Sequence, residues 1–351
     1  MPLLESRFRP AWWLRGSHAQ TLWPALFRRR PRLDIEWERL ELDDGDFLDL
    51  AWHGPRGTPV VLIFHGLQGS LRSHYAGGLM QRLAKSGMRS CLVHFRGCSG
   101  EPNRLPISYH SGKTDDPQSV LEHVTQVTGA PPFAAVGVSL GGNVLLKWLG
   151  EQGADSPLAR AAALSVPFDL AACARRLEYG FSRLYQRHLV RSLQADYRRK
   201  FARLASPLQI DVDALDSFRL FDDRVTAPLH GFAGADDYYA RCSSRRFIGR
   251  IRVPTLILHA RDDPFMFSDT APGPGDLAEC VWLEQAADGG HVGFVAGILP
   301  WRARYYAEER IAEWLSAGLP NSREAGAVTS AGKASPAPGP AAGHRAAAPG
   351  C

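Results

Sequence analysis

Short apolar runs alternate with amphipathic segments along most of the chain, and this alternation constrains the fold most strongly. The run PVVLIFHG (59–66) is almost wholly apolar, as expected of a parallel strand buried on both faces, and VPTLILHA (253–260) is similar. Further strands are expected at 88–95, 133–138, 160–166 and 279–284, and helices at 74–86, 116–128, 140–150 and 301–316. Strands that alternate with helices predict a mostly parallel sheet with helices on both faces.

Two departures from this alternation are informative. The segments 36–42 and 46–52 flank DDGD and predict an antiparallel hairpin, which brings the expected sheet to eight strands. Between about residues 167 and 233 the strands stop, and apolar residues recur with helical spacing. An insertion of this size after a strand is expected to be a helical lid over a site. Its many basic residues either face an anionic substrate or are merely solvated.

Both ends of the chain differ in composition from the body. Residues 1–33 combine seven arginines with several tryptophans, and they form either an arm that packs on the body or a peripheral contact with an anionic membrane. We favour packing, because Pro10 and Pro24 interrupt any long amphipathic helix. The tail 318–351 is rich in Ala, Gly and Pro and is expected to be disordered, which leaves residues 34–317 as the folded domain.

Charge and composition exclude several function classes. The net charge of +5 is concentrated in the N-terminal arm, so the body offers no broad basic face for nucleic acid. The 6 Cys are scattered and the 12 His form no HExxH pattern, so we expect no disulfide framework, no metal and no cofactor. No apolar run approaches the roughly 18 residues of a membrane helix, and the N-terminus lacks the order of a secretory signal. We therefore expect a cytosolic protein of undetermined oligomeric state.

The segment GVSLG, from Gly137 to Gly141, is the first candidate for chemistry. It fits G-x-S-x-G, in which a sharp strand-to-helix turn raises a nucleophilic serine above the carboxyl end of a sheet. The plain alternative is that Ser139 only caps a helix, because Ser is a common N-cap residue. The predicted strand before it and the predicted helix after it favour the nucleophile.

A nucleophilic serine needs a base and an acid that orients the base, and in this architecture they follow in the order Ser, Asp, His. Asp262 and Asp263 follow the strand at 253–260, and His291 lies in a glycine-rich loop after the next strand. We prefer Asp263 as the acid, because Pro264 fixes the turn after it. Each residue taken singly fits an ordinary turn or loop, but the order of all three predicts a catalytic triad.

The oxyanion of such a reaction needs two backbone N–H groups. We expect them from Leu140, directly after the nucleophile, and from Leu67 in the turn HGLQGS after strand 59–66. His65 in that turn is an alternative base, and we expect a structural role for it instead.

Two other patterns carry less weight. His110 and Asp115 have the H-x₄-D spacing sometimes found in acyltransferases, but such pairs arise often by chance. Cys98 is a possible reactive thiol, although a small buried residue near a turn is the better interpretation.

Several longer segments resemble the YheT-like branch of the α/β-hydrolase superfamily, also called AB hydrolase family 4. The resemblance covers roughly residues 8–316. The segments that carry it are FRPAWWLRGSHAQTLWPALFRR, FHGLQGS, HFRGCSGEPN, YHSGKTDD, GVSLGGNVLLKWLG, DDRVTAPLHGFAGADDYYARCSS, PTLILHARDDPFM and GGHVGF. It implies an α/β-hydrolase fold and a triad formed by Ser139, Asp263 and His291.

The resemblance also implies the reaction. Members of this family hydrolyse carboxylic esters, and related eukaryotic members act on medium-chain acyl esters or phospholipids or transfer the acyl group to an alcohol. We therefore expect a serine esterase of short- to medium-chain acyl esters. The alternatives are an acyltransferase or lipase that uses the same triad and, in another class, a non-catalytic lipid- or membrane-binding protein.

Overall fold

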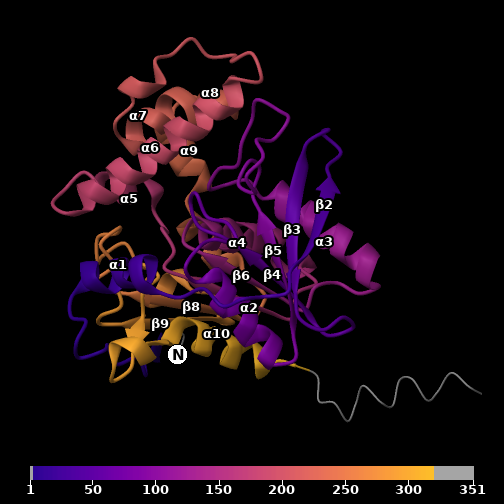
Figure 1. The fold of residues 1–351 in the computed structure, drawn as a ribbon, viewed down its shortest axis with the longest axis vertical. Coiled ribbons are helices and arrows are strands. Elements are labelled where there is room, and N and C mark those ends of the chain that lie inside the picture. Colours follow the sequence, from indigo (N-terminus) through magenta and orange to yellow (C-terminus); the bar gives the residue numbers. More distant parts are fainter. Residues whose placement is uncertain (1–2, 320–351) are drawn as a thin grey trace, which may run out of the picture. The chain divides into compact units, whose positions relative to one another are not determined.

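The apolar runs become the central strands of one twisted sheet (Figure 1). The computed structural model describes residues 3–319, of which those up to Gly318 form one unit. The strands are β1 (Leu3–Glu5), β2 (Glu36–Glu41), β3 (Phe47–His53), β4 (Val60–Phe64), β5 (Arg89–His94), β6 (Ala134–Val138), β7 (Arg160–Leu164), β8 (Thr255–Ala260) and β9 (Val281–Ala286). Their spatial order is β1-β9-β8-β7-β6-β4-β5-β3-β2, and all neighbouring pairs are parallel except β5 with β3 and β3 with β2.

The α/β architecture is confirmed, but the expected number of eight strands is wrong, because the described sheet has nine. The additional strand is β1, which extends one edge by pairing parallel with β9. Three residues are too few to show a strand period, and β1 exists only because an open sheet edge receives it. A separate small ribbon pairs β10 (Val295–Ala296) with β11 (Arg304–Tyr305).

Helices cover both faces of the sheet. The helices α3 (Asp115–Thr128) and α4 (Leu140–Gln152) pack on one face, and α2 (Ala76–Lys85) and α10 (Tyr306–Ser316) lie on the other. Leu62 and Phe64 of β4 join the core with α3 and α4, while Val61 and Ile63 point to the opposite face. All five residues of β4 are buried, which explains why its sequence shows no alternation.

The predicted lid, residues 167–233, is helical. It contains α5 (Leu170–Arg176), α6 (Ser182–Phe201), α7 (Phe218–Phe221), a π-helical turn (Asp222–Thr226) and α8 (Ala227–Leu229). One further helix, α9 (Ala235–Cys242), packs against α5 in a shared apolar cluster. In Figure 1 these helices stand above the sheet as a separate layer.

The N-terminal arm packs on the body through part of its aromatic residues. Phe8 is buried against Phe294, with ring centroids 5.4 Å apart. The helix α1 (Ser17–Phe27) follows and includes Pro24. Trp12, in contrast, is 67% exposed.

No helix within residues 3–319 is both long and apolar enough to cross a lipid bilayer. The predicted disordered tail, 318–351, lies outside the described residues apart from its first two.

Candidate active site

Ser139 occupies a strained turn between β6 and α4. Its backbone dihedrals are φ 53° and ψ −120°, which non-glycine residues rarely adopt. The flanking glycines make the turn possible, because a Cβ on Gly137 would collide with the carbonyl of Gly141, and a Cβ on Gly141 with that of Phe64. The serine is therefore held at the carboxyl edge of the sheet, at the N-terminus of α4.

Gly141→Ala is expected to destabilise the fold by about 1–3 kcal/mol, because the added methyl group would force the backbones of β4 and α4 apart. The midpoint of urea unfolding measures this loss. Gly275→Ala is the matched control, since a Cβ there meets no atom within 4 Å. Equal midpoints for the two variants would contradict the close approach.

Ser139, His291 and Asp263 form one hydrogen-bonded chain. His291 Nε2 lies 2.9 Å from Ser139 Oγ, and His291 Nδ1 lies 2.8 Å from Asp263 Oδ2. Because an ionised carboxylate only accepts, Nδ1 carries the proton and Nε2 is free to accept from the serine hydroxyl. Asp263 is 3% exposed, and its Oδ1 accepts the backbone N–H of Phe265. The ring of Phe265 stacks on the imidazole at 3.9 Å, which fixes the plane of the base.

The two backbone N–H groups expected to hold an oxyanion lie beside Ser139. In the turn after β4, the N–H groups of Gly66, Gln68 and Gly69 donate to the Tyr75 hydroxyl, the Tyr109 hydroxyl and the Gly66 carbonyl respectively. Among the described residues the N–H of Leu67 finds no acceptor, and neither does that of Leu140 in the first turn of α4.

The turn also lies close to the serine. A Cβ on Gly66 would be 3.2 Å from the Cβ of Ser139, a tight contact that shows how near the turn lies to the serine. Both unused donors are thus available to a group bound at Ser139 Oγ. Sequence reasoning missed Tyr75 and Tyr109, because nothing in the local sequence indicates that their hydroxyls accept the N–H groups of Gly66 and Gln68.

Asp262 has a different task from its neighbour. Its Oδ1 accepts the backbone N–H of Gly290, 2.9 Å away, and it makes no contact with the imidazole of His291. Burial raises the pKa of its carboxyl. The preference for Asp263 as the partner of His291 therefore agrees with the geometry, and Asp262 anchors the loop that carries the histidine.

The N-terminal arm holds the same loop from the other side. Thr21 Oγ1 accepts the backbone N–H of His291 at 2.9 Å and donates to the carbonyl of Ser17. Gln20 is fully buried and both donates to and accepts from the backbone of Val295. Sequence reasoning treated the arm as packing or as a membrane contact and missed this role. The only local trace of this role is in HAQT, which places two polar side chains in a helix whose later part is apolar.

Thr21→Val is expected to lower kcat about tenfold while the fold persists. The change keeps the shape of the side chain but leaves the N–H of His291 without an acceptor, a loss of about 1–3 kcal/mol. Ester hydrolysis at saturating substrate measures the effect, and Thr21→Ser should restore most of it. If Thr21→Ser is as impaired as Thr21→Val, the hydroxyl does not act by this hydrogen bond.

The remaining candidates have structural surroundings. His65 is fully buried, with Nδ1 donating to the Gly66 carbonyl and Nε2 accepting the N–H of Phe95, and burial lowers its pKa to about 3. It is therefore a neutral brace of the turn, as the sequence analysis expected. Burial raises the pKa of the Cys98 thiol to about 12, which makes a reactive thiolate unfavourable.

His110 and Asp115 do not act as a pair. His110 Nδ1 accepts the N–H of Gly112, and its ring packs against that of His230 at 4.5 Å. The exposed carboxyl of Asp115 pairs instead with Lys113. The H-x₄-D spacing therefore produces no dyad.

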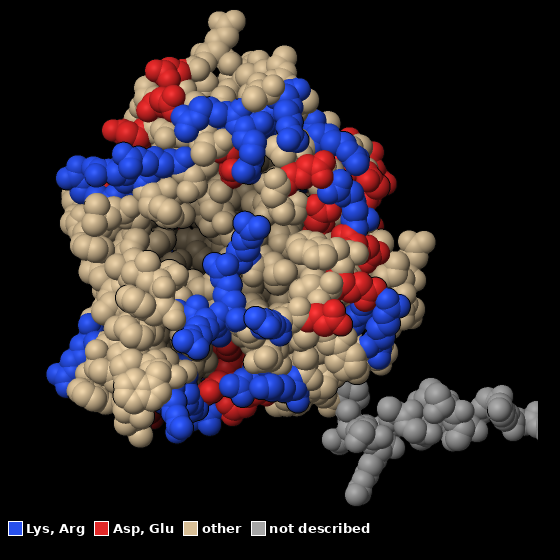
Figure 2. Space-filling view, viewed as in Figure 1, with Lys and Arg blue, Asp and Glu red and all other residues tan. Residues whose placement is uncertain are grey.

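A cavity of about 170 Å³ lies between the triad and the helical insertion. Figure 2 shows a hollow in the surface between the helical insertion and the part of the chain below it. The apolar wall of the cavity is formed chiefly by leucine and phenylalanine side chains from the helical insertion, from the turn after β4 and from the start of α4: Leu67, Leu140, Leu170, Leu177, Phe218 and Phe221. Ser139 and His291 belong to the same lining, so an apolar group in the cavity lies beside the Ser139 hydroxyl.

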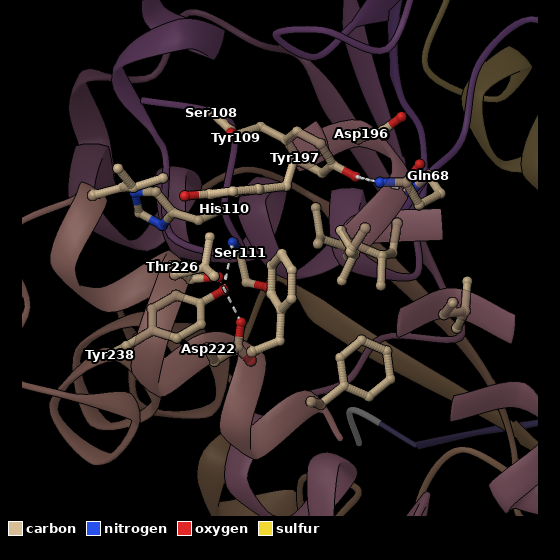
Figure 3. Close-up of a pocket in the computed structure, with 18 of the residues that line it drawn as sticks. Gln68, Ser108, Tyr109, His110, Ser111, Asp196, Tyr197, Asp222, Thr226 and Tyr238 are labelled. Carbon is tan, nitrogen blue, oxygen red and sulfur yellow. Dashed lines mark hydrogen bonds between the residues drawn. The ribbon is translucent and has the colours of Figure 1, made fainter. Parts of the chain in front are cut away.

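Polar residues line the other part of the cavity (Figure 3). Asp222, on the π-helical turn, accepts hydrogen bonds from Thr226 and from Tyr239, and burial raises its pKa to about 6. Lys200, at the end of α6, donates to the carbonyl of Ile107, and burial lowers its pKa to about 8. Sequence periodicity indicated none of these positions.

Comparison of the chain with known proteins identifies its family. A family model described as the alpha/beta hydrolase fold matches residues 59–297. The chain belongs to the α/β-hydrolases. The matched segment begins just before β4 and contains Ser139, Asp263 and His291.

Individual relatives that share 31–45% of their aligned residues with this chain show which branch of the family it belongs to. YheT of Escherichia coli (strain K12), named as a candidate esterase, is 45% identical over 90% of this chain and 94% of its own. A mouse protein named phospholipase ABHD3 is 31% identical over 87% of this chain and 77% of its own. The resemblance to YheT-like α/β-hydrolases is thereby confirmed.

Solved structures agree on the fold. An esterase of Pyrococcus furiosus superposes with a TM-score of 0.53 at 16% identity, covering 83% of this chain and 97% of its own. A likeness at this level of identity shows the shared α/β-hydrolase architecture.

Proposed function

We propose that this α/β-hydrolase is a serine esterase that cleaves short- to medium-chain acyl esters through an acyl-enzyme intermediate. The observation that carries the proposal is the hydrogen-bonded chain from Ser139 Oγ through His291 to Asp263, beside two unused backbone N–H groups. The apolar cavity next to Ser139 suits an acyl chain. The names of the relatives, candidate esterase and phospholipase, support ester chemistry.

Acylation begins when Ser139 Oγ attacks the carbonyl carbon of the ester and His291 Nε2 takes the hydroxyl proton. The negative charge moves to the carbonyl oxygen, where the N–H groups of Leu67 and Leu140 stabilise it. Asp263 keeps the imidazole in the correct tautomer and stabilises the imidazolium. The tetrahedral species then expels the alkoxide, which receives the proton from His291 and leaves as the alcohol.

Deacylation repeats these steps with water. His291 takes a proton from the water as its oxygen attacks the acyl carbon, and the same N–H groups hold the second oxyanion. The C–O bond to Ser139 breaks, Oγ regains the proton, and the carboxylic acid leaves. The chain's own groups supply every proton transfer.

A panel of p-nitrophenyl esters with acyl chains of increasing length tests the proposal, with Ser139→Ala as the control. We expect kcat/KM to rise from acetate to a medium-chain ester and then to fall when the acyl chain outgrows the cavity. Added ethanol separates hydrolysis from acyl transfer, because an ethyl ester would appear alongside the acid. Hydrolysis by Ser139→Ala at the wild-type rate would refute the proposal.

A further inference from the structure

The N-terminal arm and the loop after β10 together expose an unusual apolar surface. Its members are large side chains that are each 63–77% exposed, and we call them the docking surface: Trp12, Leu26, Phe27, Ile298 and Trp301. Exposed tryptophans are costly in water unless something covers them. Single exposed apolar residues need no explanation, but this group comes from two segments that the fold brings together.

Hydrogen bonds and ring contacts hold the docking surface in place. The indole of Trp12 donates to the Ile298 carbonyl at 3.0 Å, which ties the arm to the loop. Next to it, Trp13 donates to the Gly297 carbonyl at 3.1 Å. Rings then continue from Trp13 through Trp23 to Phe27, with centroids 4.8 Å and 4.7 Å apart. The surface is therefore a fixed feature of the fold.

The core beneath does not need these exposed rings. Ala11, Leu14 and Val295 are buried below them and already form an apolar cluster with the half-buried Trp13 and Trp23. Burial of the core thus explains part of the aromatic content of the arm and leaves the docking surface unexplained.

The unpaired charges of these two segments are basic, whereas the carboxylates that reach them, Glu308 and Glu309, are paired with Arg28 and Arg304. Residues 6–33 and 295–304 contain no acidic residue. Six exposed arginines in and around these segments form no ion pair within the described part of the chain: Arg9, Arg15, Arg29, Arg30, Arg32 and Arg302. In Figure 2 the region over α1 is mostly uncoloured with blue side chains at its margins, while red side chains gather across the face over β2 and β3.

We propose that the docking surface binds an anionic phospholipid membrane. Tryptophan and other large apolar side chains partition into the interface between headgroups and acyl chains, and unpaired arginines meet the lipid phosphates. The charge complementarity favours a lipid surface over a second copy of this chain, because two such basic surfaces would repel each other.

The surface and the candidate active site share one helix. Thr21 of α1 contacts His291, while Leu26 and Phe27 at the end of α1 belong to the docking surface. On the other side of α1, His18 packs against Phe181 of the lid, with ring centroids 4.5 Å apart. A membrane bound here lies close to the triad, yet the docking proposal stands on the surface alone and does not require the catalytic role.

Sedimentation with lipid vesicles tests the proposal on the full chain. We expect binding to vesicles of phosphatidylglycerol and phosphatidylcholine in equal parts, and much weaker binding to pure phosphatidylcholine or at high salt. Trp301→Ser with Ile298→Ser should weaken binding about tenfold or more. Arg29→Gln with Arg302→Gln should weaken it about 25-fold at low salt, since each arginine accounts for about a fivefold change.

Matched variants elsewhere on the surface serve as controls. Trp37→Ser with Val127→Ser removes exposed apolar side chains from β2 and α3, and Arg203→Gln with Arg250→Gln removes exposed arginines. These should bind vesicles as the wild type does, and all variants should hydrolyse a water-soluble ester equally if the esterase proposal holds.

Three results would overturn the docking proposal. One is equal binding to anionic and neutral vesicles, or none to either. Another is an equal loss of binding in the docking variants and their controls. The third is a concentration-dependent dimer in analytical ultracentrifugation that Trp301→Ser abolishes, because it would assign the surface to a second copy of the chain. If the wild-type protein binds anionic vesicles but does not hydrolyse the ester, the result counts against the proposed esterase function alone.

Discussion

Ser139→Ala should lower kcat for a p-nitrophenyl ester by about 10⁴-fold to 10⁶-fold. The variant keeps the cavity and both free N–H groups, so substrate binding and oxyanion stabilisation persist. It loses the only oxygen within hydrogen-bond distance of His291 Nε2 among the described residues, and no acyl-enzyme can form. The remaining rate should be that of water attacking directly. Steady-state kinetics measures kcat, and KM should change far less.

The matched control is Ser119→Ala. Ser119 lies on α3 and its hydroxyl only bonds back to the Asp115 carbonyl one turn earlier. This variant should retain wild-type kinetics. A similar kcat for Ser119→Ala and Ser139→Ala would contradict the role of Ser139 as the nucleophile.

Asp263→Asn is expected to lower kcat/KM by about 10⁴-fold with little change in the fold. The amide can present an N–H to His291 Nδ1, which then becomes the acceptor and moves the imidazole proton to Nε2. A protonated Nε2 cannot accept the proton of Ser139, so the nucleophile is not activated. The pH dependence of kcat/KM together with thermal unfolding separates this effect from misfolding.

Asp262→Asn is the neighbouring control. The Asn side-chain carbonyl can still accept the N–H of Gly290, so the loop that carries His291 should remain in place. We expect a loss of about tenfold or less, as for a group that acts only by positioning. Equal losses in the two variants would contradict the distinction between the two adjacent carboxylates.

The sequence predicted the parts of this molecule whose signals are local. The run at β4 is apolar at every position because both faces of that strand are buried, and five such residues suffice to identify it. GVSLG can be identified from the sequence because only glycine fits at Gly137 and Gly141. The order of Ser139, Asp263 and His291 follows from the strands that precede them, since the carboxyl ends of parallel strands share one edge.

Features that depend on distant contacts could not be predicted. Strand β1 has only three residues and exists through its pairing with β9, nearly the whole chain away. The hydrogen bond from His291 to Thr21 joins residues 270 positions apart, and Thr21 in the sequence is simply a polar residue in a helix. The buried Asp222 depends on a π-helical turn within the lid, and helical periodicity does not show such a turn.

The exposed rings of the N-terminal arm illustrate the same limit. Composition alone left packing and membrane contact as alternatives for one aromatic, basic segment. The fold divides that segment, because Phe8 and Leu14 enter the core whereas Trp12 and Phe27 stay exposed. Packing therefore holds for the buried set of side chains, and membrane contact is our proposal for the exposed set.

Labelling with a fluorophosphonate tests whether Ser139 is an activated nucleophile, because this reagent reacts only with a serine that a neighbouring base activates. We expect one covalent adduct on the peptide that contains Ser139, formed in the wild type, formed much more slowly in Asp263→Asn and absent from Ser139→Ala. Failure of the wild type to react would contradict the role of Ser139 and would favour a non-catalytic α/β-hydrolase fold. Equal labelling of Ser139→Ala would also contradict it, because the activated nucleophile would then lie elsewhere.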